Sequence, residues 1–338
     1  MAPVSSTTEA TAPVTAEPRT VDMPTITPGA DPAPEVELIE DGGGVVATVV
    51  LPCYNEEGHV VQEIERITAA LDADGMAYEL LVIDDKSTDG TLAAIRAVEQ
   101  RFPRMRVHPL PRNGGSGTAR RIGTREARGG IVVWTDADMT YPNERIPELV
   151  RMLLADDSID QVVGARTTEQ GTHKWARIPA KWTIRRFAEY LTGTKIPDLN
   201  SGLRAFRREV SLPYLRLLPP GFSCVTTITI SFLANQHAIR YVPIDYAQRA
   251  GRSKFAFFKD AYRYLLQVLR MVMYFDPLRV LMPLALVLLG LGIVKLVYDQ
   301  TQDLFGLAAN TVLLIMSGLI IASMGLLADL VVRSRGPS

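Results

Sequence analysis

The chain has 338 residues and a formal net charge of −1 at pH 7. This balance argues against the strongly basic class of nucleic-acid-binding proteins, and no nucleic acid partner is expected. Two cysteines, Cys53 and Cys224, do not make a disulfide framework, so free thiols in a reducing compartment are expected.

The N-terminal segment is too polar and too irregular to form a core. Residues 1–41 contain eight acidic residues and one basic residue, Arg19, and seven prolines precede Glu35. Large apolar residues are sparse and unpatterned there, so their burial cannot offset the entropy lost on ordering. The segment also lacks the basic start and apolar run of a signal peptide. We expect residues 1–44 to be a disordered tail.

Apolar runs then alternate with helical patterns. The expected strands lie at 45–54, 78–85, 105–110, 130–138 and 160–166, and the expected helices at 56–74, 89–102, 116–128 and from about 143. This alternation predicts an α/β domain with a mostly parallel central sheet that is covered on both faces. Ligands bind such sheets at the carboxyl ends of the strands. Three of the expected strands end there in the polar clusters PCYNEE, DDKSTDGT and TDADMT.

The third cluster contains two carboxylates, Asp136 and Asp138, with only Ala137 between them. Two like charges this close repel each other unless a positive charge offsets them. Mg²⁺ is commonly held by one or two carboxylates together with substrate phosphates. The pair therefore predicts a metal ion that holds a diphosphate, and solvated loop acids are the alternative.

The second cluster adds Asp84 and Asp85 at the same edge, where a carboxylate can accept hydrogen bonds from a base or a ribose. A plain helix start capped by Ser87 or Asp89 is compatible with this role. The glycine-rich segment RNGGSGTARR, residues 112–121, leads into a helix whose free amides favour anions. Its position and spacing do not fit the dinucleotide fingerprint, and a flexible, basic helix start is the alternative.

Two apolar runs near the C-terminus, at about 280–298 and 308–327, are each about long enough to cross a bilayer. We expect a transmembrane hairpin over residues 276–332, with a buried hairpin in a soluble protein as the alternative. Arginines flank its outer ends and acidic residues lie in its connecting loop. The positive-inside rule therefore predicts a multi-pass membrane protein whose N-terminus, central domain and C-terminal tail, residues 333–338, are cytoplasmic.

Two further segments have the pattern of helices that lie in a membrane surface. Residues 255–275 combine an apolar aromatic stripe with basic residues and lead directly into the first span, which predicts an interfacial helix. Lys181 and Arg185 lie four residues apart beside another apolar stripe and could attract anionic lipid head groups. For both segments, an ordinary amphipathic surface helix is the alternative.

Five motifs occur in an order typical of one enzyme family: LPCYNEE, DDKSTDGT, DADMTYP, PDLNSGLRAFRRE and RAGRSKF. Over residues 45–275 the chain resembles family 2 glycosyltransferases of the polyprenyl-phosphate branch, which is similar to dolichol-phosphate mannose synthase. The resemblance implies a GT-A nucleotide-sugar-binding domain over residues 45–254. It also implies a UDP- or GDP-linked sugar donor and a divalent metal, Mg²⁺ or Mn²⁺.

The resemblance assigns roles to particular residues. The donor pocket would be formed by Pro52, Tyr54, Glu56, Asp84 and Asp136, and the metal would be held by Asp136 and Asp138, with Gln170 as a weaker third ligand. The catalytic pair would be Asp198, either a general base or a loop organiser, and Arg204, which would also contact the acceptor phosphate or the diphosphate. The phosphates would be bound by Arg166, Arg252 and Lys254, and Lys181 and Arg185 would face the lipid acceptor.

The implied reaction is an inverting transfer of a hexose to a polyprenyl phosphate in the cell membrane, with release of a nucleoside diphosphate. A phosphate monoester has a second pKa of about 6, so the acceptor is mostly a dianion at neutral pH and needs little help from a base. This favours the organiser role for Asp198. The alternatives are a glycosyltransferase that extends a polysaccharide and a non-catalytic adaptor that binds nucleotide sugars. A homo-oligomer is also left open.

Overall fold

The computed structural model describes residues 44–167, 185–186, 189–190, 193–221, 223–247, 266, 269–270, 273–302 and 308–334. All of the expected N-terminal tail except Gly44, and most of the expected interfacial helix 255–275, lie outside them. The described elements, in chain order, are β1 Ala47–Cys53, α1 Val60–Asp74, β2 Tyr78–Asp84, α2 Thr91–Val98, η1 Glu99–Arg101, β3 Met105–Pro109, α3 Ser116–Glu126, β4 Ile131–Trp134, η2 Asn143–Arg145, α4 Ile146–Ala155, β5 Gln161–Arg166, β6 Arg204–Arg207, α6 Arg208–Ser211, η3 Leu212–Leu217, α7 Cys224–Ala234, β7 Ile239–Ile244, α9 Leu278–Gln302 and α10 Ala309–Ser334.

The strands form one sheet in the order β3-β2-β1-β4-β6-β5-β7. β1 pairs in parallel with β2 and β4, β2 pairs in parallel with β3, and β5 pairs in parallel with β7. β6 runs antiparallel to both of its neighbours, β4 and β5. The expected mostly parallel sheet is therefore confirmed, with β6 as its reversed strand.

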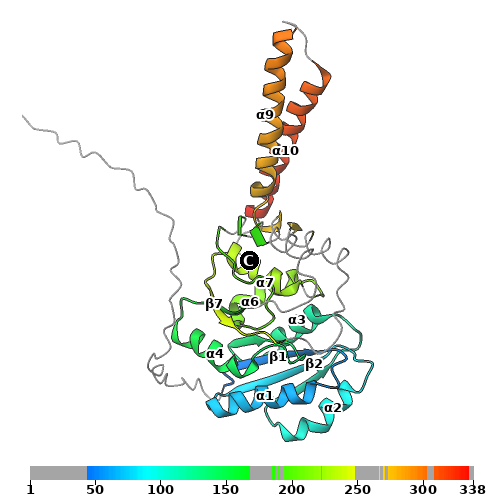
Figure 1. Ribbon diagram of the computed structural model, residues 1–338, viewed down its shortest axis with the longest axis vertical. Helices are drawn as coiled ribbons and strands as arrows, with labels where there is room; N and C mark the ends of the chain where they lie inside the picture. The colour runs from blue at the N-terminus through cyan, green and yellow to red at the C-terminus, as the bar shows by residue number, and fades with distance from the viewer. Residues whose placement is uncertain are drawn as a thin grey trace, which may run out of the picture. The chain divides into compact units, whose positions relative to one another are not determined.

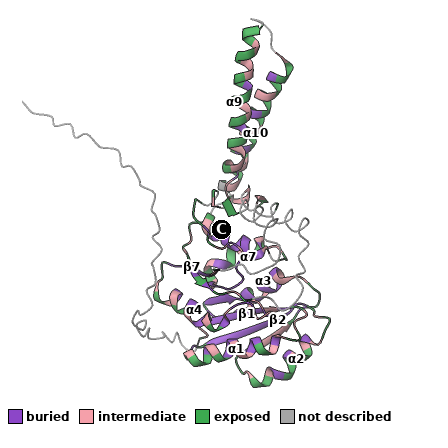
Figure 2. Cartoon of the chain, viewed as in Figure 1, coloured by how far each residue is buried: buried purple, intermediate pink, exposed green. Residues whose placement is uncertain are grey.

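Helices cover both faces of the sheet. Successive side chains of a strand point to opposite sides, so these apolar strands present an apolar surface on each face. On β1, Val49 and Leu51 pack with α1, α2 and α4, while Val50 packs on the other face with α3 and α7. Figure 1 shows α1, α2 and α4 on one side of the strands and α3 and α7 on the other. The purple strands of Figure 2 are buried between these layers, and all seven residues of β2 are buried.

Helix α1 illustrates how the sequence forms one of these layers. Its buried residues include Val60, Ile64, Ile67 and Leu71, whose three- and four-residue spacing places them on one helix face. The helix ends at Gly75, which has a φ of +74°, a left-handed conformation that glycine adopts without steric cost. The chain then turns back into β2.

The five expected strands and their intervening helices are present, with shorter ends than predicted. The fourth expected strand stops at Trp134 instead of Asp138, because its pairing with both β1 and β6 ends at Trp134. β6 and β7 were not expected from the sequence. β6 has only four residues, two of them arginines, and β7 alternates buried with exposed positions as an edge strand does.

The C-terminal segment forms the hairpin α9–α10 (Figure 1). Both helices are long and apolar enough to cross a membrane, with mean hydropathies of 2.5 and 2.3 over their most apolar windows, and most of their side chains are exposed (Figure 2). Their backbones approach closely: a Cβ on Gly292 would lie 3.2 Å from Ile315 N, and one on Gly318 would lie 3.1 Å from Ala285 O. Small residues at such contacts are typical of membrane helix pairs, so a membrane-spanning hairpin fits these helices better than a soluble core.

The segment that leads into α9 contacts the central domain. Phe275 and Val280 pack against a small apolar cluster of Ile196, Leu199 and Ile230. Ile196 and Leu199 flank Asp198 in the chain. The start of the hairpin therefore supports the loop that carries this predicted site residue.

Candidate active site

The sheet brings most of the described site residues to one edge. β1, β2, β4 and β5 end there, and β6 begins there because it runs in the opposite direction, with Arg204 paired to Trp134. Pro52 on β1 pairs with Ile83 on β2, and Asp84 ends β2. The loops after β1, β2 and β4 each contain a non-glycine residue with positive φ: Asn55 at +57°, Lys86 at +59° and Met139 at +61°. Such strained conformations occur preferentially at functional sites.

The loops after β1 and β2, which carry the predicted nucleoside pocket, are fastened to each other. Asn55 N donates to Ser87 Oγ at 3.1 Å, Thr88 N donates to Asn55 Oδ1 at 2.8 Å, and Glu56 N donates to Thr91 Oγ1 at 2.8 Å. These bonds fix the backbone at Asn55 and Glu56, directly after Tyr54. The two loops therefore form one rigid wall of the sheet edge.

In the second acidic cluster, Asp84 and Asp89 accept hydrogen bonds from different backbone amides. Asp84 is buried and accepts a hydrogen bond from Ser87 N, at 3.4 Å to Oδ1 and 3.3 Å to Oδ2, which shapes the turn after β2. Asp89 Oδ1 accepts a hydrogen bond from Thr91 N, the first amide of α2, at 3.0 Å. The N-cap residue of α2 is Gly90, however, and not Ser87 or Asp89 as expected from the sequence.

The glycine-rich turn before α3 binds a carboxylate of the protein itself. Gly114 N and Gly115 N donate to the two oxygens of Asp85 at 2.6 and 2.7 Å. Burial raises the pKa of Asp85, and these two amides act against that rise. Gly115 has a φ of +79°, and a Cβ there would lie 2.5 Å from Pro220 O, so only glycine fits. Asp85 thus takes the place that an external anion would occupy.

Asp136 is offset by a positive charge that belongs to the protein. The Arg120 guanidinium, on α3, donates from Nη2 to Asp136 Oδ1 at 2.6 Å, and the Arg120 side chain is 1% exposed. Asp138 Oδ1 accepts hydrogen bonds from Thr140 Oγ1 at 2.5 Å and Thr140 N at 3.3 Å. One carboxylate therefore faces a buried cation, and the other is held within a tight turn.

The two aspartates fit a divalent cation. Their carboxylate oxygens are the hard ligands that Mg²⁺ and Mn²⁺ take, both side chains are partly exposed, and Arg120 contacts Asp136 through one of its two oxygens. No group of three histidine, cysteine or acidic side chains with metal-binding geometry occurs among the described residues. Further ligands would therefore come from diphosphate oxygens or water, while the weaker candidate Gln170 lies outside the described residues.

Asp198 and Arg166 form a two-pronged ion pair. Arg166 Nε lies 2.7 Å from Asp198 Oδ2, and Arg166 Nη2 lies 2.9 Å from Asp198 Oδ1. Burial by itself raises the pKa of Asp198, but the hydrogen bonds and charge of Arg166 outweigh it and hold the pKa below its ordinary value. Asp198 also accepts a hydrogen bond from Asn200 N at 2.9 Å. A carboxylate this strongly engaged is a poor proton acceptor at neutral pH.

Arg204 lies inside the protein and does not face the edge. Its guanidinium donates to Val225 O at 2.9 Å, to Thr229 Oγ1 at 2.8 Å and to Ser201 O. Burial, and after it the positive charge of Arg120, lower the pKa of Arg204 to about 10, so this arginine is still a cation at neutral pH. The expected contact with a phosphate finds no support in this arrangement. Arg204 instead joins β6 to α7.

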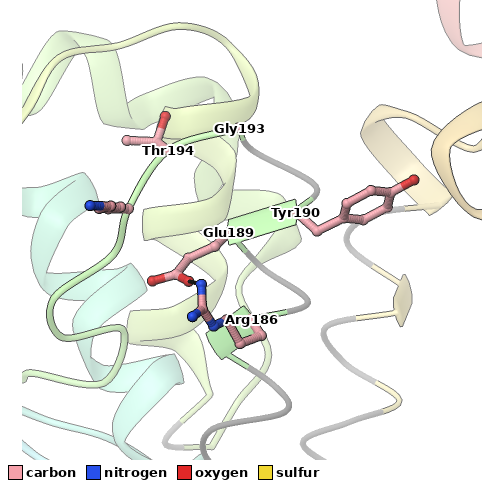
Figure 3. A pocket seen from close by; sticks show the side chains of 6 residues that line it. Arg186, Glu189, Tyr190, Gly193 and Thr194 are labelled. Atoms are coloured by element: carbon pink, nitrogen blue, oxygen red, sulfur yellow. Dashed lines mark hydrogen bonds and ion pairs between the residues drawn. The ribbon is translucent and has the colours of Figure 1, made fainter. Parts of the chain in front are cut away.

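The segment that contains Lys181 and Arg185 is described only in part, and this part borders an open pocket of about 460 Å³. The pocket is lined by Arg186, Glu189, Tyr190, Gly193, Thr194 and Lys195. Figure 3 shows Arg186 and Glu189 turned toward each other, 3.4 Å apart, with the Tyr190 ring pointing away from them. Arg185, a predicted acceptor residue, lies 3.8 Å from Glu189. No lining residue is a predicted donor or metal residue, and Lys181, Arg252 and Lys254 lie outside the described residues.

A buried network behind the acidic pair was not anticipated. Glu63 on α1 is fully buried and accepts a hydrogen bond from Asn143 Nδ2, and Thr135 Oγ1 donates to Asn143 Oδ1 at 2.5 Å. Burial raises the pKa of Glu63. The network connects the loop after β4 to α1. The sequence contains two signals for these residues. Glu63 is an acidic residue among the apolar positions of the expected helix, and Arg120 lies in the basic stretch TARR.

Comparison with known proteins gives two family matches. Residues 48–212 match the glycosyl transferase family 2, and residues 276–333 match the GtrB C-terminal hairpin. The undecaprenyl-phosphate 4-deoxy-4-formamido-L-arabinose transferase of Aeromonas hydrophila subsp. hydrophila is 32% identical over 252 residues, 73% of each chain. The Enterobacter sp. (strain 638) protein of the same name is 33% identical over 217 residues, and this alignment covers 63% of each chain.

Solved structures show the same fold. Glucosyl-3-phosphoglycerate synthase from Mycobacterium tuberculosis, in complex with Mn²⁺, UDP-glucose and phosphoglyceric acid, superimposes with a TM-score of 0.54 at 23% identity. The match covers 68% of this chain and 80% of that one. A structure of the same synthase with phosphoglyceric acid gives a TM-score of 0.53 at 24% identity, covering 68% and 81%. The expected GT-A type of α/β fold is thereby confirmed.

Proposed function

Because the chain belongs to glycosyltransferase family 2, in the branch of the undecaprenyl-phosphate sugar transferases, we propose that it transfers a sugar from a nucleoside diphosphate sugar to a polyprenyl phosphate in a membrane. The products are a polyprenyl-phosphate sugar and a nucleoside diphosphate. The relatives named above act on a modified arabinose, so the expected hexose has only the general resemblance behind it.

The observation that carries this proposal is the placement of Asp136 and Asp138. Both follow β4 at the sheet edge where β1 and β2 end and the loops of the proposed donor pocket begin. Asp136 is also held by a hydrogen bond from Arg120. A bound divalent cation would supply Lewis-acid charge there and stabilise the departing nucleoside diphosphate. Mg²⁺ and Mn²⁺ both suit the oxygen ligands, and the related fold has been solved with Mn²⁺ and UDP-glucose.

The remaining residues bind and orient the substrates. The wall formed by the loops after β1 and β2, with Pro52, Tyr54, Glu56 and Asp84, would hold the nucleoside of a UDP or GDP donor. Arg166 and Asp198 would fix the acceptor loop as a paired unit, and Arg252 and Lys254 would neutralise phosphate charge. Since the acceptor phosphate is already ionised, the protein contributes position and charge instead of a strong base.

The resemblance to the family branch implies an inverting transfer. The acceptor oxygen would approach the sugar from the side opposite the leaving diphosphate, which would invert the anomeric carbon and give a β-linked product from an α-linked donor. The hairpin α9–α10 would hold the enzyme in the bilayer where the polyprenyl chain lies. By the positive-inside rule the catalytic domain and both termini would be cytoplasmic, and Lys181 and Arg185 would face lipid head groups.

An acceptor panel tests the proposal. The purified full chain, in a bilayer with Mg²⁺ or Mn²⁺, is given labelled UDP- and GDP-sugars, including a modified arabinose donor, and either undecaprenyl phosphate, 3-phosphoglycerate or an oligosaccharide. We expect label in the lipid fraction from one donor, with undecaprenyl phosphate as the acceptor. Label in a soluble phosphate ester or in a growing polysaccharide would contradict the proposal, and absence of transfer from every donor would favour the adaptor alternative.

A further inference from the structure

Arg120 is buried beside the acidic pair and had no role in the sequence analysis. It lies on α3, and its side chain is 1% exposed. Its Nη2 donates to Asp136 Oδ1 at 2.6 Å and to Thr135 O at 3.4 Å, and its Nη1 lies 3.7 Å from Cys224 Sγ. The guanidinium also lies 5.6 Å from the centre of the Trp134 ring. Arg120 therefore contacts the end of β4 and the residues that follow it.

Asp136 is the acidic side chain that balances Arg120. Among the described residues, no other carboxylate lies within ion-pair distance of the Arg120 guanidinium. The Arg120 Nε is buried and has no hydrogen-bond partner among the described residues. A buried guanidinium is costly unless it is paired. The protein places this buried charge directly beside Asp136, the first aspartate of the acidic pair. This placement indicates that Arg120 serves the function of Asp136.

The second oxygen of Asp136 is constrained as well. A Cβ on Gly202 would lie 2.6 Å from Asp136 Oδ2, so the chain before β6 approaches this carboxylate as closely as a glycine allows. Gly202 N donates to Tyr141 Oη at 2.6 Å, which holds that chain segment in place. The Asp136 carboxylate is thus bracketed, with Arg120 at one oxygen and Gly202 beside the other. Its side chain nevertheless keeps 27% of its surface exposed.

We propose that Arg120 is a positioning residue that acts through Asp136, fixing Oδ1 so that the rest of the carboxylate is presented to a metal–diphosphate ligand in one orientation. This inference rests on the proposed function, because it assumes that Asp136 serves such a ligand. The Arg120 side chain itself does not reach the ligand. Its contribution is that the carboxylate needs no reorientation when the metal and nucleotide arrive.

Binding of a nucleoside diphosphate to the full chain tests this proposal. The dissociation constants of UDP and GDP are measured by calorimetry with saturating Mn²⁺ and with EDTA. For the nucleotide that binds more tightly, we define the metal gain as the dissociation constant in EDTA divided by the dissociation constant in Mn²⁺. The variants are Arg120→Lys, Asp136→Asn and the double variant. The control is Arg207→Lys, because Arg207 is a partly buried arginine at the opposite end of β6 that donates to Leu153 O and Ile159 O.

We expect Arg120→Lys to reduce the metal gain by about 10- to 100-fold, the usual effect of losing a residue that orients a metal ligand. Arg207→Lys should lower the melting temperature but leave the metal gain unchanged. The double variant should have the metal gain of Asp136→Asn alone, because Arg120 acts only through that carboxylate.

Three outcomes overturn the proposal in distinguishable ways. If Arg120→Lys keeps the wild-type metal gain while its melting temperature falls as in Arg207→Lys, Arg120 only stabilises the fold. If the double variant loses more metal gain than Asp136→Asn, Arg120 acts on the ligand by a route other than Asp136. If the wild-type chain shows no metal gain at all, the metal role in the proposed function fails, and this inference fails with it.

Discussion

At the scale of single residues, the two aspartates after β4 have different surroundings although they lie two positions apart. Asp136 pairs with the buried Arg120, whereas Asp138 bonds within its own turn to Thr140. Both should be required for activity, but only the first also neutralises a buried charge. This difference separates a loss of function from a loss of fold.

We therefore predict that Asp138→Ala abolishes turnover and leaves the free energy of unfolding nearly unchanged. Asp136→Ala should also abolish turnover, and it should cost about 3–5 kcal/mol of stability because it leaves Arg120 buried and unpaired. Denaturant unfolding of the two variants, together with turnover rates, checks this. Near-normal turnover in Asp138→Ala, or equal stability of both variants, would contradict it.

The buried Glu63 predicts a pH dependence. Because burial raises the pKa of Glu63 above its unfolded value of about 4.3, its stabilising contribution is complete below that value and is lost as pH rises through the folded pKa. The stability of Glu63→Gln relative to the wild type should therefore increase as pH is raised from about 5 to about 8. Unfolding free energies over this range measure it. A difference that stays constant with pH would show that Glu63 does not titrate as inferred.

The residue scale also shows what sequence can and cannot predict. The acidic pair was recognisable because two carboxylates directly follow a strand, which depends only on local order. Arg204 was expected at a phosphate because a motif indicates proximity to the site but not the direction of a side chain. Its burial against α7 depends on Val225 and Thr229, which the sequence places more than 20 residues away. Arg120 was missed for the same reason, since its partner is 16 residues further along.

At the scale of elements, the parallel strands other than β7 were predictable because their runs are mostly apolar and their helices are amphipathic. β6 was not, because RAFR is short and its arginines suggest a surface loop. Its antiparallel pairing with β4 and β5 arises from tertiary contacts alone. This reversed strand is nonetheless what carries the loop of Asp198 to the edge where the parallel strands end.

The loop around Asp198 and the start of the hairpin form a second coupled pair of elements. Phe275 packs against Ile196, Leu199 and Ile230, so the segment before α9 stabilises the loop that holds the ion pair with Arg166. We predict that Phe275→Ala raises the KM for polyprenyl phosphate about tenfold, equivalent to about 1.4 kcal/mol, without changing nucleotide affinity. Steady-state kinetics with each substrate varied in turn measures this.

A matched control separates this effect from a general disturbance of the hairpin. Val294 on α9 is 69% exposed, so Val294→Ala removes apolar surface that does not pack on the loop. It should leave both KM values unchanged. If Phe275→Ala behaves like Val294→Ala, or weakens nucleotide binding equally, the hairpin start does not position the acceptor loop.

At the scale of the whole molecule, the chain combines a GT-A type of α/β fold with two helices that are long and apolar enough to cross a membrane. This combination is what a reaction between a water-soluble donor and a lipid-borne phosphate requires. The predicted donor residues and the acidic pair lie at one sheet edge, and the loop of Asp198 contacts the start of the hairpin. The proposed site and the apolar hairpin are therefore connected through the loop of Asp198.

The central claim is that the acidic pair, with a divalent cation, allows a membrane phosphate to receive a sugar. The most direct test follows labelled sugar into undecaprenyl phosphate with the full chain in a bilayer, before and after divalent ions are removed with EDTA. We expect labelled lipid to form, EDTA to abolish its formation, and Mn²⁺ or Mg²⁺ to restore it in the wild type but not in Asp138→Ala. Undiminished formation of labelled lipid after chelation would contradict the account.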